Sequence, residues 1–186
     1  MQKIFERVKK IILDPKGALN EVKDEEFVVM DFMKEYVVIV GAIPAASMFI
    51  GLIGRFNLFV VLMYAALTYG IGVLMVFVFG KIIDALASSF NATKNDLNAF
   101  KLSAYTYTPF FVAGIANINP ALSFLSLVGL AYGLYILYMG TQTLMQAPQE
   151  KAVLYTVAAI VINVVISVIL YTIAATLTGI GFFVSS

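Results

Sequence analysis

Long apolar stretches separated by short polar segments dominate this chain of 186 residues. Four long runs contain no charged residue, and they cover residues 36–54, 56–80, 102–149 and 152–186. A helix needs about 20 apolar residues to cross a bilayer core of roughly 30 Å. The runs of 19, 25 and 35 residues therefore hold one span each, and the run of 48 residues holds two. The pattern predicts an all-α, polytopic membrane protein with a bundle of five transmembrane helices.

The expected domain organisation follows from where the apolar runs begin. A cytosolic, amphipathic head covers residues 1–35, and the transmembrane domain covers residues 36–186. A secretory signal peptide needs an apolar core within its first 15–30 or so residues. The first long apolar run begins only at Tyr36, so we expect the first span to remain in the mature protein. The five predicted spans cover residues 36–54, 58–83, 97–116, 121–140 and 152–177.

The first twelve residues of the head have the pattern of an amphipathic helix. Apolar residues recur at helical spacing, and they are Ile4, Phe5, Val8, Ile11 and Ile12. Such a helix either lies in the membrane interface or packs on the cytoplasmic ends of the spans, and the sequence favours neither. The first alternative makes four basic residues candidate contacts to the lipid surface: Lys3, Arg7, Lys9 and Lys10.

A turn signal follows this helix. Residues 14–17 read Asp-Pro-Lys-Gly, in which the proline biases Asp14 away from the α-helical region and Gly17 tolerates a turn. The sequence therefore predicts that the first helix ends here. We expect a second short helix over residues 19–34.

The distribution of Lys and Arg predicts the orientation in the membrane. With a cytoplasmic N-terminus, eleven of the twelve basic residues lie inside, and only Arg55 lies outside. Cytoplasmic segments of membrane proteins carry an excess of Lys and Arg. We therefore expect the N-terminus in the cytoplasm and, after five spans, the C-terminus outside, in the cell membrane if the protein is prokaryotic.

The composition excludes several classes of chemistry. The chain contains no Cys and no His, which removes thiol nucleophiles, disulfides, the commonest metal ligand and the commonest general base. The sequence offers no acidic residue between Asp96 and Glu150 for an intramembrane aspartyl protease, and no Gly-rich phosphate loop. We expect a protein that is not an enzyme and that has no cofactor, no metal and no nucleic-acid partner.

Charged residues close the second span. Lys81 and Asp84 stand three positions apart, which is close enough along a helix for an ion pair. An ionisable residue inside a membrane is a functional candidate. These two residues, however, lie where the span leaves the hydrocarbon, so a snorkelling lysine beside a carboxylate is the favoured interpretation.

The third span is the most polar of the five. Residues 103–109 include Ser, Thr and Tyr residues followed by Pro109, which removes a backbone hydrogen bond and bends the helix. The favoured interpretation is that these hydroxyls bond the backbone of a kinked helix. The alternative is a polar cavity or lipid-headgroup pocket beside the kink, lined by Tyr105 and Thr108.

Small residues recur every fourth position in the fourth span. Gly129 and Gly133 form a GxxxG pattern, which lets two helix backbones approach closely. Packing inside the monomer is the favoured interpretation of this face. A homodimer through the two glycines is the alternative.

Several blocks of the sequence resemble the Yip family, the Ypt- and Rab-interacting membrane proteins with five spans, and more closely its prokaryotic branch. They are an amphipathic N-terminal helix followed by Asp14-Pro15-Lys16, Phe79-Gly80, Ala104-Tyr-Thr-Tyr-Thr-Pro109, and Leu134-Tyr-Ile-Leu-Tyr-Met-Gly140 with Leu144-Met145 and Pro148-Gln-Glu-Lys151. The resemblance runs over almost the whole chain. It implies the five-span fold and a cytosolic face that binds partners, which in eukaryotic members are prenylated Rab-type GTPases. The Asp-Leu-Tyr-Gly-Pro motif of those members is absent here, which argues against a GTPase partner.

Two classes of function remain open at this point. The first is a non-catalytic membrane scaffold or adaptor in membrane organisation or trafficking, which binds a protein or lipid at its cytosolic face. The second is a small-solute or lipid transporter with a polar path beside the Pro109 kink, lined by Tyr105 and Thr108 and by Lys81 and Asp84.

Overall fold

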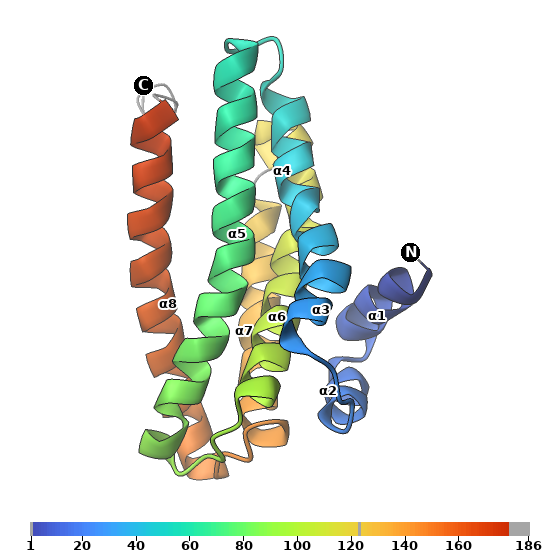
Figure 1. The fold of residues 1–186 in the computed structure, drawn as a ribbon, viewed down its shortest axis with the longest axis vertical. Helices are drawn as coiled ribbons and strands as arrows, with labels where there is room; N and C mark the ends of the chain where they lie inside the picture. Colours follow the sequence, from blue (N-terminus) through green and yellow to red (C-terminus); the bar gives the residue numbers. More distant parts are fainter. Residues whose placement is uncertain (1, 123, 179–186) are drawn as a thin grey trace.

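The computed structural model describes residues 2–122 and 124–178, and these residues fold into α-helices joined by short turns (Figure 1). These residues form no β-strand, and an isolated bridge joins Ile53 to Phe56. Two short helices lie beside a bundle of long ones (Figure 1). The expectation of an all-α protein is confirmed.

The N-terminal segment forms two helices that meet at Pro15. Helix α1 covers Gln2–Leu13 and helix α2 covers Pro15–Lys23. Proline is well suited to the first helical position, because its fixed φ is helical and its missing N–H has no partner there in any case. The Asp14 side chain caps α2 by accepting a hydrogen bond from the Gly17 N–H at 2.9 Å. Pro15 therefore ends one helix and starts the next.

The expected helix over residues 19–34 is wrong. Helix α2 ends at Lys23, and residues 25–28 are not helical. Helix α3 (Val29–Phe32) then continues through the π-helical turn η1 (Met33–Val37) into α4 (Val38–Leu52). The first long helix therefore begins at Val29, seven positions before the apolar run that marked it in the sequence. Three charged residues in this part of the helix interrupt the apolar pattern, so the pattern alone placed the start of the helix too late.

The remaining helices run close to the predicted spans but differ at their ends. Their bounds are α5 Leu58–Ala87, the 3₁₀ turn η2 Ser88–Phe90, α6 Asp96–Ala113, the 3₁₀ turns η3 Gly114–Ile118 and η4 Pro120–Leu122, α7 Leu125–Thr143 and α8 Gln149–Thr178. Helix α5 continues four residues beyond the predicted end of its span, which places Lys81 and Asp84 inside the helix. Helix α6 ends earlier than predicted, because the backbone tightens into η3 after Ala113.

Successive long helices run in opposite directions along the bundle (Figure 1). The links 88–95 and 144–148 lie together at one end, while the turn at residues 53–57 and the end of α8 lie at the other (Figure 1). Helix α6 packs against α4, α5 and α7, whereas α8 packs mainly on α5 and stands at the outside of the bundle (Figure 1).

Three segments of the described chain are long and apolar enough to cross a membrane on their own: Val29–Leu52, Leu58–Phe90 and Gln149–Leu177. Most of their apolar surface is not covered by the rest of the protein. On α8, for example, Val161, Val165 and Ile169 are each more than half exposed. Because such a surface is stable only in contact with lipid, the protein is an integral membrane protein.

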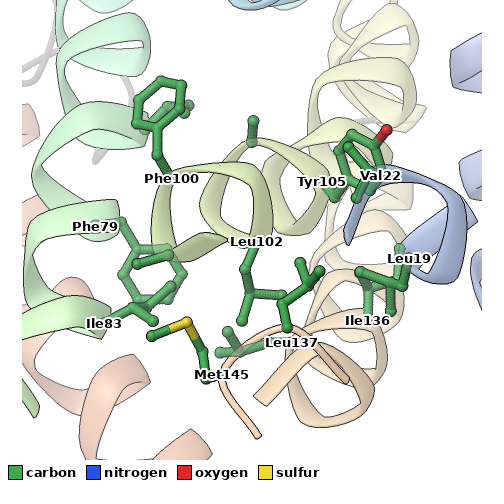
Figure 2. Packing of buried hydrophobic residues seen from close by; sticks show 14 of the residues in the cluster. Leu19, Val22, Phe79, Ile83, Phe100, Leu102, Tyr105, Ile136, Leu137 and Met145 are labelled. Carbon is green, nitrogen blue, oxygen red and sulfur yellow. The ribbon is translucent and has the colours of Figure 1, made fainter. Parts of the chain in front are cut away.

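The best-buried part of the interior surrounds α6 (Figure 2). Leu102 of α6 is fully buried between Ile136 and Leu137 of α7 and Ile83 of α5 (Figure 2). Leu19 of α2 is also fully buried, and it lies beside Ile136 (Figure 2). The α1–α2 segment is therefore part of the packed structure and not a free extension.

Candidate functional site

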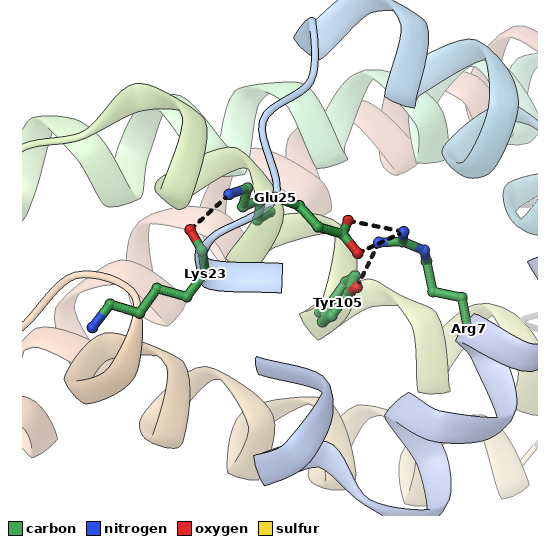
Figure 3. Close-up of polar contacts among 5 residues, drawn as sticks. Arg7, Lys23, Glu25 and Tyr105 are labelled. Carbon is green, nitrogen blue, oxygen red and sulfur yellow. Dashed lines mark hydrogen bonds and ion pairs between the residues drawn. The ribbon is translucent and has the colours of Figure 1, made fainter. Parts of the chain in front are cut away.

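A group of polar contacts lies where α1 and the segment that follows α2 meet α6 (Figure 3). Arg7 of α1 donates a hydrogen bond from Nη1 to the Tyr105 hydroxyl of α6 at 2.8 Å. Its Nη2 donates to both carboxylate oxygens of Glu25, at 2.9 and 3.1 Å. The guanidinium group also lies 5.5 Å from the centre of the Phe32 ring. We call Arg7, Glu25 and Tyr105 the Arg7 cluster.

The Arg7 cluster is half-buried, with 29% of the Arg7 side chain and 41% of the Glu25 side chain exposed. Burial by itself would lower the pKa of Arg7. The negative charge that its neighbours Tyr105 and Glu25 can carry, and the hydrogen bonds they accept, outweigh burial and raise the pKa above its ordinary value. The guanidinium group therefore stays charged, and the cluster acts as a permanent ionic contact.

Two side chains of the bundle cap the C-terminal ends of α1 and α2. The Tyr132 hydroxyl of α7 donates to the Ile12 carbonyl at 2.8 Å. Lys101 Nζ of α6 donates to the Lys23 carbonyl at 3.2 Å (Figure 3). The last carbonyls of a helix have no partner within it, and they attract a cation. These contacts attach both short helices to the bundle at defined positions.

Lys101 is buried although it is a lysine, with 1% of its surface exposed. Its ammonium group lies 5.3 Å from the centre of the Phe27 ring, in the segment that follows α2. Sequence reasoning counted this residue only toward the orientation of the chain. The available signal was that Lys101 is the one charge within predicted span 97–116.

The hydroxyl groups of α6 point to different neighbours. The Thr108 hydroxyl donates to the Ala104 carbonyl of its own helix at 2.8 Å. Its single proton is then in use, so Tyr36 of η1 donates to Thr108 Oγ1, also at 2.8 Å. Both side chains are buried. Tyr105 and Thr108 are thus both occupied in structural contacts, one with α1 and the other with η1.

Lys81 and Asp84 do not form the ion pair that their spacing allows. Lys81 Nζ lies 2.7 Å from Oδ1 of Asp96 at the start of α6, and Asp84 Oδ2 lies 3.9 Å from Lys94 Nζ. Because α5 continues to Ala87, Asp84 is turned into the protein, with 9% of its surface exposed, while the Lys81 side chain is half exposed. The Asp84 Oδ1 atom has no hydrogen-bond partner among the described residues.

Pro109 lies inside α6, and its carbonyl faces the GxxxG residues of α7. A Cβ atom at Gly129 would lie 2.6 Å from the Pro109 carbonyl oxygen, and one at Gly133 would overlap the Thr106 carbonyl oxygen. Both glycines are buried. The two glycines therefore let α6 and α7 of one chain approach closely.

Comparison with known proteins agrees with this architecture. Residues 9–171 match the Yip1 domain. The chain belongs to the Yip1 domain family. It is also similar to the inner membrane protein YohC of Escherichia coli, with 24% identity over 182 residues, which cover 90% of this chain and 93% of YohC. YohC of a second E. coli strain matches equally well. None of the solved structures matches the chain significantly.

Two of the blocks that resemble the Yip family form the α6–α7 interface of this Yip1 domain. The block 104–109 lies on α6 and the block 134–140 on α7. A Cβ atom at Gly140 would overlap the Leu102 side chain of α6. Gly129 and Gly133, at other positions of α7, lie against the backbone of α6. A close helix contact of the domain thus involves sequence blocks that resemble the family. The contacts of the two glycines with α6 of the same chain favour the monomer-packing interpretation over the homodimer.

The four candidate lipid contacts of α1 separate into two groups in the Yip1 domain. Arg7 belongs to the Arg7 cluster and faces α6, so its prediction as a lipid-surface residue is wrong. Lys10 pairs with Glu21 of α2. Lys3 and Lys9 are exposed. The reason is that α1 buries Ile11 and partly buries Val8 against the protein, which turns Arg7 inward and Lys9 outward.

Proposed function

We propose that this Yip1-domain protein is a non-catalytic membrane scaffold or adaptor, which binds a partner at the cytoplasmic face through the outer face of α1. The observation that carries the proposal is the exposure of apolar residues on a helix that the Arg7 cluster attaches to the bundle. Phe5 and Leu13 are each 71% exposed. A short helix that served only for packing would bury its largest apolar side chains.

The chemistry of this outer face favours an anionic lipid surface as the partner. Phe5, Lys9 and Leu13 are four positions apart and form one stripe along α1, and Lys3 is exposed beside them. Aromatic and aliphatic side chains insert at the boundary of headgroups and acyl chains, while each nearby lysine adds about 1 kcal/mol of attraction to anionic lipids. The cytoplasmic-protein partner expected from the family resemblance is the other occupant that fits an adaptor.

The orientation in the membrane is part of the proposal. We place five passes, formed by the helix from Val29 and by α5, α6, α7 and α8, with the N-terminus in the cytoplasm and the C-terminus outside. The bundle end with the links 88–95 and 144–148 then faces the cytoplasm, and α1 and α2 lie beside the half of the bundle nearer to this end (Figure 1). This orientation agrees with the excess of lysine in these segments. The final residues 179–186 lie outside the described residues. The similarity to an inner membrane protein supports a location in the cell membrane.

The structure offers less support for the transporter alternative as the sequence suggested it. That path required Tyr105, Thr108, Lys81 and Asp84 to face one cavity. In the protein Tyr105 contacts Arg7, Thr108 contacts Tyr36, and Lys81 and Asp84 pair separately with residues 94–96. Side chains held in separate contacts favour a structural role.

Photo-crosslinking from α1 tests the proposal. A photoreactive amino acid replaces Phe5 in the full-length protein, first in cells and then in lipid nanodiscs with and without phosphatidylglycerol. We expect adducts with phosphatidylglycerol, which decrease when Lys3 and Lys9 are changed to Gln. The matched control places the photoreactive residue at Leu154 of α8, which is 63% exposed. It should label lipids equally in both kinds of nanodisc.

The outcomes in cells and in nanodiscs separate the two partners. If the photoreactive residue at position 5 forms adducts with a cytoplasmic protein in cells and no lipid adducts in nanodiscs, the adaptor role is supported and the partner is a protein instead of a lipid surface. If Phe5 yields neither lipid nor protein adducts while Leu154 is labelled, the outer face of α1 binds nothing and the proposal fails.

A further inference from the structure

A polar cavity of about 300 Å³ borders the Arg7 cluster, between α1, α2 and α6. Four of its lining residues, at positions 3, 6, 7 and 10, lie on one face of α1, because they are three and four positions apart. The stripe of Phe5, Lys9 and Leu13 lies on a different face, so the cavity is separate from the surface of the proposed function. The cavity is lined by three basic and three acidic side chains: Lys3, Arg7, Lys10, Glu6, Glu21 and Glu25.

Both signs of charge remain available in this cavity. Arg7 binds Glu25. Lys10 binds Glu21, and this contact uses one of the three N–H groups of the lysine and one of the two carboxylate oxygens. Glu6 is exposed and forms no ion pair with any described residue. The cavity therefore has groups for an anion and for a cation at the same time.

A buried hydroxyl group adds a hydrogen-bond donor beside Arg7. Tyr105 lines the cavity, although only 3% of its surface is exposed. Its hydroxyl oxygen accepts the hydrogen bond from Arg7 Nη1, and Figure 3 shows the two groups facing each other. The hydroxyl proton has no acceptor among the described residues. Because a hydroxyl can donate as well as accept, an anionic oxygen bound beside Arg7 would give this proton its acceptor.

The cavity lies at the level of the lipid headgroups. The ring centres of Tyr105 and Tyr36 are 6.4 Å apart, and Tyr36 begins the apolar run that follows the charged residues 34 and 35. On α6 the last charged residue is Lys101, about one turn before Tyr105. Both helices thus pass from charged to apolar sequence beside the cavity. Such a transition marks the boundary between headgroups and hydrocarbon, where tyrosine is enriched.

The balance of charge restricts the ligand. An anion alone would meet the three carboxylates of the cavity and be repelled by them, whereas a headgroup with a phosphate and a primary ammonium group satisfies both signs. The quaternary ammonium group of choline has no N–H to donate and is typically bound by cages of aromatic rings. Tyr105 is the one aromatic residue among the described residues that line the cavity. Glu6 and Lys10 are one helical turn apart, about 6 Å, which suits an ammonium group and a phosphate joined by two carbons.

We infer that this cavity binds a phosphoethanolamine group, as the headgroup of a phospholipid. The phosphate lies at Arg7 and Lys10, and the ammonium group lies at Glu6 and Glu21. Free phosphoethanolamine has the same chemistry and is distinguished from the lipid in the test. The inference does not depend on what binds the outer face of α1.

Native mass spectrometry of the full-length protein in detergent measures this binding, because each bound lipid adds its own mass. The protein is titrated with dioleoyl phosphatidylethanolamine, phosphatidylcholine or phosphatidylglycerol, which share the same acyl chains. Phosphatidylethanolamine should bind about two- to fivefold more tightly than the other two, which is the effect of an exposed ion pair. O-phosphoethanolamine should displace it only at a large excess. Equally tight binding of O-phosphoethanolamine would keep the site and replace the lipid by the free compound.

A pair of substitutions tests the carboxylates. Glu6→Gln together with Glu21→Gln should weaken phosphatidylethanolamine binding about two- to fivefold and strengthen phosphatidylglycerol binding. Loss of a merely structural contact would not exchange the lipid preference. The matched control, Glu26→Gln together with Glu150→Gln, removes the same charge at exposed positions outside the cavity and should leave the preference unchanged.

A single substitution tests the phosphate contact. Lys10→Gln should weaken the binding of both phosphatidylethanolamine and phosphatidylglycerol, because both carry a phosphate. Lys16→Gln is the matched control, since Lys16 is exposed and does not line the cavity. Lys3 is left unchanged, because it also lies beside the outer stripe of α1.

Three results would overturn the inference. The first is equally tight binding of phosphatidylcholine, because it would show that the ammonium N–H groups are not recognised. The second is tighter binding of phosphatidylglycerol to the native protein, which would show a simple anion site. The third is an unchanged lipid preference in Glu6→Gln with Glu21→Gln while circular dichroism shows native helix content. None of these results alters the crosslinking expected at position 5, so the two proposals fail independently.

Discussion

The substitution Gly129→Ala tests the assignment of the GxxxG residues to packing inside the monomer. An added Cβ atom would lie 2.6 Å from the Pro109 carbonyl oxygen and 2.7 Å from the Ala113 Cβ atom of α6. Unstrained contacts are several tenths of an ångström longer. Both atoms belong to the backbone or its first side-chain atom, so neither can turn away. Helix α7 must therefore move away from α6.

The magnitude follows from two opposing effects. Forcing an extra methyl group into a packed interface costs about 1–3 kcal/mol. Alanine is favoured over glycine inside a helix by about 1 kcal/mol, which offsets part of this cost. We expect Gly129→Ala to lower the free energy of unfolding by up to about 2 kcal/mol. Gly70→Ala in α5 is the matched control, because a Cβ atom there meets nothing within 4 Å, and the helix preference alone should raise stability.

Thermal unfolding in detergent, followed by circular dichroism, measures both variants. For a chain of this length, 1 kcal/mol shifts the midpoint by about 2–4 °C, so a difference of about 1–3 kcal/mol between the two variants should separate their midpoints by on the order of 2–12 °C. Crosslinking of the same samples reports the oligomeric state. The reasoning is refuted if Gly129→Ala unfolds at the same temperature as Gly70→Ala and instead loses a dimer that the native protein forms.

Three further predictions concern α6 and the links. Tyr105→Phe removes the hydroxyl that accepts a hydrogen bond from Arg7 and should lower stability by about 1 kcal/mol, whereas Tyr135→Phe at an exposed position should not, as thermal unfolding can show. Pro109→Ala restores a backbone donor within α6 and should leave the midpoint equal or higher; a clear decrease would show that the proline ring is essential for packing. In sealed cells a membrane-impermeant thiol reagent should label a cysteine introduced at residue 57 and not one at residue 91, and the reverse pattern would invert the orientation.

The sequence was sufficient for the helices because their determinants are local. Apolar runs of fixed length predict membrane helices whatever their neighbours are, and α5 begins at Leu58 as the pattern indicated. The predicted helix boundaries are wrong where one local sequence signal is compatible with two structures. Pro15 was taken only as the end of a helix, although proline also starts helices, and the charged residues before Tyr36 concealed that the first long helix begins at Val29.

The candidate site depended on contacts between segments distant in the sequence. The pairing of Arg7 with Tyr105 joins residues 98 positions apart, and no sequence pattern around either residue predicts it. Lys81 and Asp84 show the converse, because their spacing suggested a pair that the surrounding helices divide between Asp96 and Lys94. Charge and spacing restrict which pairs are possible, and only packing selects among them.

The sequence by itself determined the class of the protein: an apolar, helical membrane protein without His or Cys, with seven of its twelve basic residues before the first long apolar run at Tyr36. These properties follow from transfer of side chains into lipid, which depends on each segment alone. The tertiary structure decided which face of α1 is exposed, which hydroxyls of α6 are bonded and which charged residues share a cavity. These features depend on how the helices are rotated and spaced relative to one another, and that geometry arises from the sum of many small packing contacts.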